Sequence, residues 1–172
     1  GIGPLNFEQV VGVTKAYISR VGTGPFITEQ ENEIGDYMIE KGAEFGTVTG
    51  RRRRCGWLDL VSLRYSRRIN SLSQLFITKL DVLSGLEEIK VCVGYKFEDK
   101  KITDYPLIDE ILDECEPVYE SFGGWDEDIS KITKYDALPE NAKKYIEFIE
   151  EFINVPIKYI SVGPERNQNI IR

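Results

Sequence analysis

The sequence feature that most restricts the fold is a one-sided helical pattern that runs directly into a strand pattern. In residues 138–153, LPENAKKYIEFIEEFI, apolar side chains recur on one helix face while Glu and Lys occupy the other. Pro139 suits the first position of this helix, and Val155 and Pro156 end it. Residues 157–161, IKYIS, then have the pattern of a strand that ends at Val-Gly-Pro. A helix followed at once by a strand is typical of α/β proteins.

The rest of the chain also alternates between strand and helix patterns. Residues 75–77 and 89–95 have the apolar, β-branched pattern of buried strands. A helix-compatible run covers residues 57–70, and a shorter helix is expected over 34–40, stopped by Gly42. The remaining expectations are a helix or strand over 7–17, loops at 20–26 and 122–125, a hairpin at 97–102, a one-sided helix over 107–115 and a short strand at 117–120. We therefore predict one α/β domain over residues 1–172, part of a larger mixed, mostly parallel sheet with flanking helices.

Charge and composition exclude several classes of function. The 172 residues carry 29 Asp and Glu against 22 Lys and Arg, a net charge of −7, which argues against a general polyanion-binding protein. No apolar run approaches the roughly 20 residues that a membrane span needs, and no signal-peptide pattern opens the chain. Because the chain has no histidine, histidine acid–base chemistry is not expected of it.

The cysteines and the single methionine bear on where the chain comes from. Cys55, Cys92 and Cys115 are odd in number and widely spaced, which fits neither a disulfide framework nor a zinc site and favours a reducing cytoplasm. The only methionine is Met38, so the chain does not begin at a translation start. We therefore expect a processed or excised piece, or a chain whose initiator was removed.

Residues 46–57, GTVTGRRRRCGW, place four consecutive arginines after a loop of small residues. The small residues let the backbone approach a ligand closely and offer N–H and hydroxyl donors. Arg51, Arg52, Arg53 and Arg54 supply planar forks suited to a carboxylate or a phosphate. Nucleic-acid binding would need more stacking aromatics and a wider basic field than this loop provides. The pattern therefore favours a small-anion site, with a plain solvated turn as the alternative.

Two of the expected strands end in polar residues that could bind a base. In open α/β sheets, ligands bind at the carboxyl ends of the strands. The strand at 75–77 runs into Thr-Lys-Leu-Asp, where the Asp81 carboxylate could accept paired N–H groups of a guanine ring and the Lys79 stem could pack over the base. Ser161 and Gly163 could add backbone N–H donors to the same base. Four residues are a weak pattern, and a surface Lys–Asp pair beside a simple strand exit has the same sequence.

Taken together, these pieces resemble one family, the adenylosuccinate synthetases. The resemblance rests on five segments in order: KAYISRVGTGPF (15–26), EFGTVTGRRRRCGWLDLVSLRYS (44–66), INSLSQLFITKLDVLSGLEEIKVCVGY (69–95), CEPVYESFGGW (115–125) and LPENAKKYIEFIEEFINVPIKYISVGP (138–164). It implies the carboxyl-terminal portion of a P-loop NTPase-like synthetase fold. It also implies an enzyme that uses GTP and Mg²⁺ to phosphorylate the 6-oxygen of IMP. L-Aspartate then displaces that phosphate to give adenylosuccinate, the committed step toward AMP.

The resemblance further implies roles for individual residues. The aspartate and IMP sites would take Val21, Thr47, Val48, Thr49, Gly50, Arg51 and Arg53. The GTP site would take Arg53, Lys79, Leu80, Asp81, Ser161, Val162 and Gly163. Arg52 and Arg54 would instead face neighbouring acidic residues or solvent. Many members of the family have Thr where Val48 stands, so a hydroxyl contact from that position would be missing here.

The same resemblance implies what this chain would not supply. The family's acid–base residues, its Gly-rich phosphate loop and its Mg²⁺ ligands are expected upstream, so no catalytic or metal-ligating residue is assigned here and the chain alone would be inactive. The expected partners are IMP, L-aspartate, GTP and a second copy in a homodimer, without nucleic acid or membrane, in the cytoplasm. The main alternative is a stand-alone guanine-nucleotide-binding module without catalysis, and a third hypothesis is a nucleic-acid-binding fragment that uses the four arginines.

Overall fold

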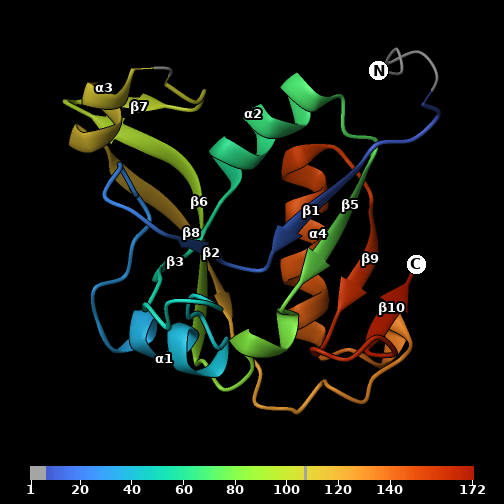
Figure 1. The fold of residues 1–172 in the computed structure, drawn as a ribbon. Helices are drawn as coiled ribbons and strands as arrows, with labels where there is room; N and C mark the ends of the chain where they lie inside the picture. Colours follow the sequence, from blue (N-terminus) through green and yellow to red (C-terminus); the bar gives the residue numbers. More distant parts are fainter. Residues whose placement is uncertain (1–6, 107) are drawn as a thin grey trace.

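The computed structural model describes residues 7–106 and 108–172, which form an α/β fold of two four-stranded sheets, one two-stranded sheet and flanking helices (Figure 1). The first sheet has the order β1 (Val11–Lys15), β5 (Gln74–Thr78), β9 (Ile157–Ser161) and β10 (Asn169–Ile171). The strands β1, β5 and β9 are parallel, and β10 is antiparallel to β9. Lys15 pairs with Thr78, and Ile77 pairs with Ile160, so the carboxyl ends of three strands lie side by side.

The second sheet is built around the long strand β6 (Glu88–Phe97). Strand β4 (Leu58–Asp59) is parallel to β6, whereas β7 (Lys100–Ile102) and β8 (Glu116–Gly123) are antiparallel to it. The third sheet consists of β2 (Ile18–Arg20) and β3 (Arg54–Gly56), paired antiparallel. This small sheet brings the segment after β1 next to the segment that contains the four arginines.

The helices are α1 (Glu33–Lys41), α2 (Leu60–Asn70), α3 (Asp109–Glu114) and α4 (Glu140–Ile153), and the 3₁₀ turns are η2 (Leu80–Leu83) and η3 (Tyr135–Ala137). The start of α2 is set by Asp59, whose Oδ1 accepts hydrogen bonds from the N–H groups of Val61 (2.9 Å) and Ser62 (3.1 Å). Asn32 caps α1 in the same way. Helices α1 and α2 therefore begin where a side chain satisfies their first free N–H groups, whereas α3 and α4 begin without a side-chain cap.

The core gathers around α4, whose buried face carries Ala142, Tyr145, Ile146, Ile149 and Ile153. Phe122 of β8 packs edge-on against the Tyr145 ring, and the Tyr145 hydroxyl donates a 2.6 Å hydrogen bond to the carbonyl of Ala16, just beyond β1. One helix thus contacts both four-stranded sheets, and its buried tyrosine hydroxyl is satisfied.

The structure confirms the α/β class, the mixed sheet and the main elements expected from sequence. The helix expected over 138–153 is α4, the strand at 157–161 is β9, and the shorter helix is α1. The open assignment of residues 7–17 is resolved as strand β1. Leu107, at the start of the helix expected over 107–115, lies outside the described residues, and α3 covers Asp109–Glu114.

The structure corrects the expected conformation of two segments. The run at 57–70 is not one helix, because Leu58 and Asp59 pair with β6 as strand β4 and the helix starts only at Leu60. The expected loop at 122–125 is partly strand, because β8 extends through Phe122 and Gly123 in its ladder with β6. In both places backbone pairing with a distant strand decides the local conformation.

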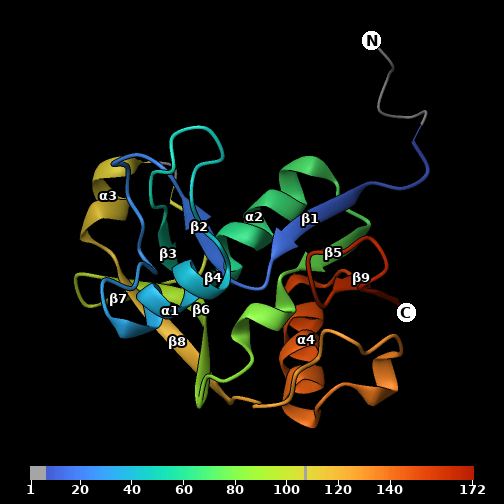
Figure 2. The same cartoon turned by 60° about the horizontal axis from the view of Figure 1, so that its bottom comes forward.

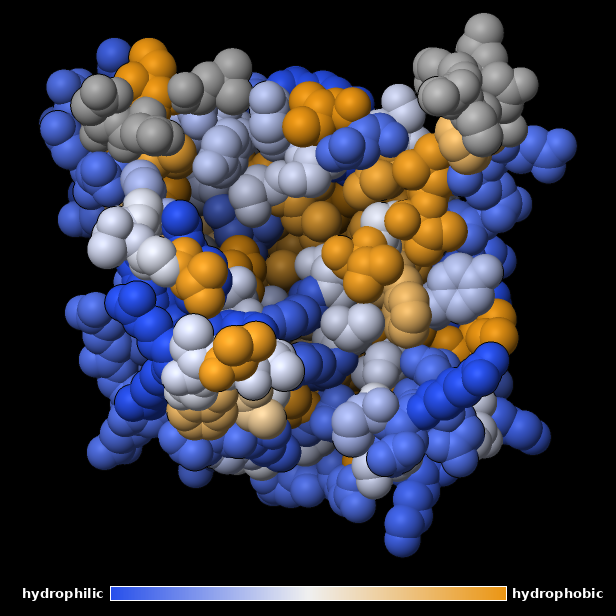
Figure 3. Space-filling view, viewed as in Figure 1, coloured by the Kyte–Doolittle hydropathy of each residue, from blue (hydrophilic) through white to orange (hydrophobic). Residues whose placement is uncertain are grey.

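Strand β1 lies at the end of the strand order of its sheet and presents apolar side chains to the surface. Val11 is 41% and Val13 is 69% exposed. Beside them is a hollow of about 360 Å³ whose lining includes Gly12, Leu63 and Leu72, and Figure 3 shows hydrophobic surface around a hollow on this side. Among the described residues, no helix is long and apolar enough to cross a membrane.

Candidate functional site

The carboxyl ends of β1, β5 and β9 bring most of the sequence-predicted guanine residues to one edge. After β5 the chain turns at Lys79, which has a left-handed backbone (φ 59°), and enters η2. Ser161 ends β9, the strand next to β5, and Val162 and Gly163 follow it. This is the position at which open α/β sheets bind their ligands.

Asp81 has a buried carboxylate oxygen, Oδ1, without a hydrogen-bond partner among the described residues. Burial raises the pKa of Asp81 above its ordinary value, although the nearby Lys41 and Lys79 act in the opposite direction. A buried, unpaired carboxylate oxygen is costly to a protein, so a ligand that donates N–H groups would be stabilised here.

The Lys79 side chain is engaged by other residues in this structure. Its ammonium group donates hydrogen bonds to the carbonyl of Gly42 and to Oε1 of Glu44, the latter at 3.1 Å. The neighbouring Leu80 is fully buried and anchors the turn in the core. The Lys79 ammonium group is thus hydrogen-bonded to Gly42 and Glu44, while Oδ1 of Asp81 has no hydrogen-bond partner among the described residues.

The segment after β9 is held by its own hydrogen bonds. The Ser161 hydroxyl donates to the carbonyl of Gly163 (2.8 Å), and the N–H of the buried Val162 donates to the carbonyl of Gln168 (2.9 Å). A Cβ at Gly163 would come within 2.3 Å of the Gln168 side chain, so a larger residue here would require that side chain to move. The N–H of Val162, which the resemblance also places in the GTP site, is therefore already bonded within the segment.

The tip of the arginine loop, residues 47–51, is exposed and shaped by local hydrogen bonds. The N–H of Gly46 donates to the carbonyl of Arg51 (2.8 Å), and Gly50 turns with a positive φ of 62°. Val48 is 96% exposed, and Thr47 and Thr49 are exposed as well. Figure 2 shows this loop projecting beyond β2 and β3. The tip therefore offers backbone, hydroxyl and guanidinium groups to the surroundings.

The base of the loop is held by ion pairs. Arg52 pairs with Asp36 of α1, and Arg54 donates from Nε to Oε1 of Glu29 at 2.7 Å. These two contacts confirm that Arg52 and Arg54 face neighbouring acidic residues. The expectation that the arginines lead into a helix was wrong, because Arg54 is the first residue of β3.

Val21 lies in a loop that Arg54 holds through hydrogen bonds to its backbone carbonyls. The Arg54 guanidinium donates to the carbonyls of Gly22 (3.0 Å) and Gly24 (2.9 Å), and Arg20 pairs with Arg54 across β2 and β3. The Val21 side chain is 65% exposed. The structure thus brings the loop of Val21 beside the arginine loop, as one site would require.

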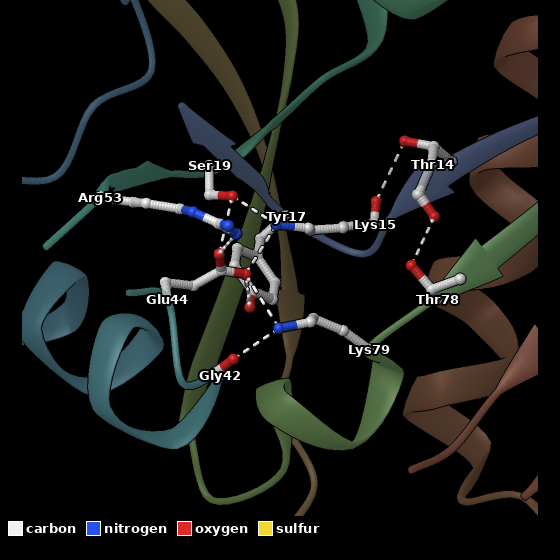
Figure 4. Close-up of polar contacts among 9 residues, drawn as sticks. All are labelled: Thr14, Lys15, Tyr17, Ser19, Gly42, Glu44, Arg53, Thr78 and Lys79. Carbon is white, nitrogen blue, oxygen red and sulfur yellow. Dashed lines mark hydrogen bonds and ion pairs between the residues drawn. The ribbon is translucent and has the colours of Figure 1, made fainter. Parts of the chain in front are cut away.

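A buried carboxylate, Glu44, joins the arginine loop to the end of β5, and the sequence reasoning assigned it no role. Glu44 is fully buried, and Figure 4 shows five side chains converging on it. The donors are Lys15 (2.7 Å), Tyr17 (2.7 Å), Ser19 (3.0 Å), Arg53 (2.8 Å) and Lys79 (3.1 Å). Glu44 therefore connects Arg53 of the arginine loop with Lys79 at the end of β5.

The surroundings of Glu44 fix its charge. Burial alone would raise its pKa, but hydrogen bonds from Lys15, Tyr17, Arg53 and Lys79 outweigh burial and hold the pKa of Glu44 well below its ordinary range. Burial, and then the hydrogen bond to Glu44, raise the pKa of the Tyr17 hydroxyl. At neutral pH the Glu44 carboxylate is therefore ionised, and the Tyr17 hydroxyl keeps its proton and donates it in a hydrogen bond.

The described residues do not fit a protein-bound metal centre. Within 7–106 and 108–172, no three His, Cys, Asp or Glu side chains lie close enough together to hold a metal ion. Glu29, Asp36 and Glu44, which lie beside the loop, are each paired with an arginine or a lysine.

Comparisons with known proteins agree with these features. The family model described as adenylosuccinate synthetase matches residues 1–170. The adenylosuccinate synthetase of Alkaliphilus metalliredigens is 55% identical over 172 residues, which are 100% of this chain and 40% of that relative. That of Thermoanaerobacter sp. is 56% identical over 171 residues, or 99% and 40% of the two chains.

A solved structure has the same fold. The structure of fully ligated adenylosuccinate synthetase from Plasmodium falciparum matches with a TM-score of 0.96 and 52% identity, covering 100% of this chain and 42% of that one. The chain spans about 40% of the length of the curated relatives it matches. With a family model matched over nearly its whole length and relatives above 50% identity, this chain belongs to the adenylosuccinate synthetase family.

Proposed function

We propose that this chain supplies aspartate and guanine recognition to an enzyme that ligates IMP and L-aspartate in a GTP-dependent reaction, with release of adenylosuccinate, GDP and phosphate. Membership of the family supports the ligase chemistry. The observation that carries the assignment to these residues is the buried Oδ1 of Asp81, which lacks a partner among the described residues at the carboxyl end of a parallel strand. Guanine presents adjacent N–H donors that match such a carboxylate.

At the aspartate end, the loop at 47–53 provides the groups that a dicarboxylate needs. The exposed tip offers the hydroxyls of Thr47 and Thr49 and the backbone of Gly50. Arg51 is exposed, and Arg53 uses Nη1 for Glu44, which leaves the other donors of its fork available. Two arginine forks beside hydroxyl groups bind two carboxylates with defined orientation. We propose that Arg51 also reaches the IMP ribose and that Val21 lines the IMP site.

At the guanine end, Asp81 would accept the paired N–H groups of the base. Lys79 and Leu80 form the turn on which Asp81 stands, and the segment from Ser161 to Gly163 lies at the end of the neighbouring strand. The chain's own residues bind and orient substrates, and none of them is assigned as the proton-transfer group. The Mg²⁺ that the family's use of GTP implies is given no ligand from the described residues.

The reaction itself is tested in a full-length synthetase whose corresponding residues are these 172. We expect adenylosuccinate formation, followed by absorbance, that depends on GTP, IMP and L-aspartate. In the same protein, Asp81→Asn should lower the preference for GTP over ITP about tenfold, because ITP lacks the 2-amino donor. The control Asp36→Asn alters an exposed carboxylate and should leave that preference unchanged. No product formation, or an unchanged preference in Asp81→Asn, contradicts the proposal.

The alternative is a guanine-nucleotide-binding module that works without catalysis. Calorimetry of the 172-residue chain with GDP separates the two: tight binding by the chain alone would favour the module. We expect weak or no binding, because the resemblance places the phosphate-binding loop outside this chain. A nucleic-acid role is disfavoured by the pairing of Arg52 and Arg54 with carboxylates.

We also propose that the protein works in the cytoplasm. Cys55 and Cys92 are buried free thiols and Cys115 is a partly buried one, as expected of a protein in a reducing compartment. Assembly as a homodimer stays a prediction that sedimentation of the full-length protein would test.

A further inference from the structure

Glu44 divides its hydrogen bonds between the two ends of the proposed site. Oε1 accepts from Lys15, Tyr17 and Lys79, and Oε2 accepts from Ser19 and Arg53. The first oxygen is therefore shared with the turn after β5, and the second with the base of the arginine loop. A single carboxylate thus sets the positions of both segments relative to each other (Figure 4).

The cationic side chains that pair with Glu44 are partly exposed, whereas Glu44 itself is buried. The Glu44 side chain is 0% exposed, whereas those of Lys15, Arg53 and Lys79 are 27%, 32% and 34% exposed. Each cation therefore has one side toward the buried carboxylate and another toward the surface. Three cations share one anion, so net positive charge remains on the exposed side, where anionic substrate groups would approach.

We propose that Glu44 is a positioning residue, which holds Arg53 for L-aspartate and Lys79 for GTP through opposite oxygens of one carboxylate. The proposal rests on the function proposed above for those two residues. A lysine or arginine side chain has several flexible torsions, and fixing it before the ligand arrives lowers the entropy lost on binding. Glu44 touches neither substrate in this proposal, and its effect passes through the two cations.

The packing around the cluster leaves little room for another arrangement. A Cβ at Gly42 would come within 2.2 Å of the Tyr17 hydroxyl oxygen, and the Gly42 carbonyl accepts a hydrogen bond from Lys79. The N–H of Arg53 donates to the carbonyl of Glu44 (2.9 Å), so backbone and side chain of the same two residues are tied together. The Glu44 carboxylate is therefore held in a fixed position, and its hydrogen bonds orient the Arg53 and Lys79 side chains.

The test is Glu44→Gln in the full-length synthetase that carries these residues, because Gln keeps the shape and removes the charge. We expect the KM values for L-aspartate and for GTP each to rise about tenfold, because both cations lose the negative charge that holds them and the NH2 group that replaces one oxygen cannot accept a hydrogen bond. The KM for IMP and kcat should change by less than about threefold. A thermal melt is recorded in parallel, because a purely structural role would lower the melting temperature without separating the substrates.

The matched control is Glu29→Gln, the same change at the carboxylate that pairs with the neighbouring Arg54. It should leave the KM values for L-aspartate and GTP unchanged. The inference is overturned if the KM values of Glu44→Gln for L-aspartate and GTP both stay within about threefold of those of the unmodified enzyme. It is also overturned if Glu29→Gln raises these two KM values as much as Glu44→Gln does. If Glu44→Gln does not fold, Glu44→Asp is measured instead, because Asp keeps the charge but withdraws the carboxylate by one methylene. The KM values for L-aspartate and GTP should then both rise, and unchanged values overturn the inference. An unmodified synthetase without activity would instead refute the proposed function.

Discussion

The tip and the base of the arginine loop differ in how their side chains are held. At the tip, residues 47–51 are exposed, and the only hydrogen bonds recorded there among the described residues are local to the loop. At the base, each arginine has its own carboxylate: Arg52 has Asp36, Arg53 has Glu44 and Arg54 has Glu29. Four arginines that are equivalent in sequence therefore have four different environments.

This difference indicates which arginines remain available for a ligand. Arg54 uses its guanidinium for Glu29 and for the carbonyls of Gly22 and Gly24, so its role is to shape the neighbouring loop. Arg51 pairs with no carboxylate in the described part of the chain. Arg53 is intermediate, since one nitrogen is held by a buried anion while a third of its side chain is exposed. The guanidinium groups therefore become less available to a ligand from the tip of the loop to its base.

The largest effect is expected from Arg51→Leu at the tip. In the full-length enzyme, the KM for L-aspartate should rise about 100-fold, because a bidentate charged contact made only with the ligand is removed. The KM for GTP should change far less. The melting temperature should stay the same, because the side chain holds nothing else in place. Equal effects on L-aspartate and GTP would contradict the role assigned to the tip.

Arg53→Leu should give the second largest effect, this time on stability. The change removes one donor from a fully buried carboxylate, which costs about 2 kcal/mol of unfolding free energy. Urea unfolding of the 172-residue chain, monitored by circular dichroism, measures it. A stability equal to that of the unchanged chain would show that Lys15, Tyr17, Ser19 and Lys79 satisfy Glu44 without Arg53.

A smaller effect is expected on the pH dependence of stability. The cluster lowers the pKa of Glu44, so the native state binds fewer protons at acid pH than the unfolded state does. The resulting stability is fully present above the ordinary pKa of 4.5 and is lost as the pH falls below it. The gap in unfolding free energy between the chain and its Glu44→Gln variant should therefore narrow from about pH 4.5 downward. Parallel curves would contradict a charged Glu44.

The main elements of the fold could be predicted because each has its own periodicity. The helix α4 and the strands β5, β6 and β9 are long enough to display one. The strands β2, β3 and β10 have three residues each, which is too short for a pattern. Strand β4 was read as helix because Leu58 continues the apolar spacing of α2, and only pairing with Val91 shows it to be a strand.

Candidate site residues could be predicted from the sequence where they are contiguous, and not where only the topology brings them together. The arginine loop and the residues around Asp81 are local motifs. Glu44 was missed because its partners Lys15 and Lys79 are 29 and 35 residues away along the chain, and only the side-by-side ends of β1 and β5 bring them together. The one available signal was an acidic residue directly before a basic loop, which alone does not predict burial.

The smallest effect is expected from Arg52→Leu, which serves as the internal control for the whole loop. Its ion pair with Asp36 joins side chains that are 48% and 64% exposed, and such a pair contributes about 0.5 kcal/mol or less. Stability in urea and the KM values for all three substrates should therefore stay close to those of the unchanged protein. A clear rise in the KM for L-aspartate would mean that Arg52 leaves Asp36 when the ligand binds. The ligand-binding part of the loop would then extend from the tip into the base.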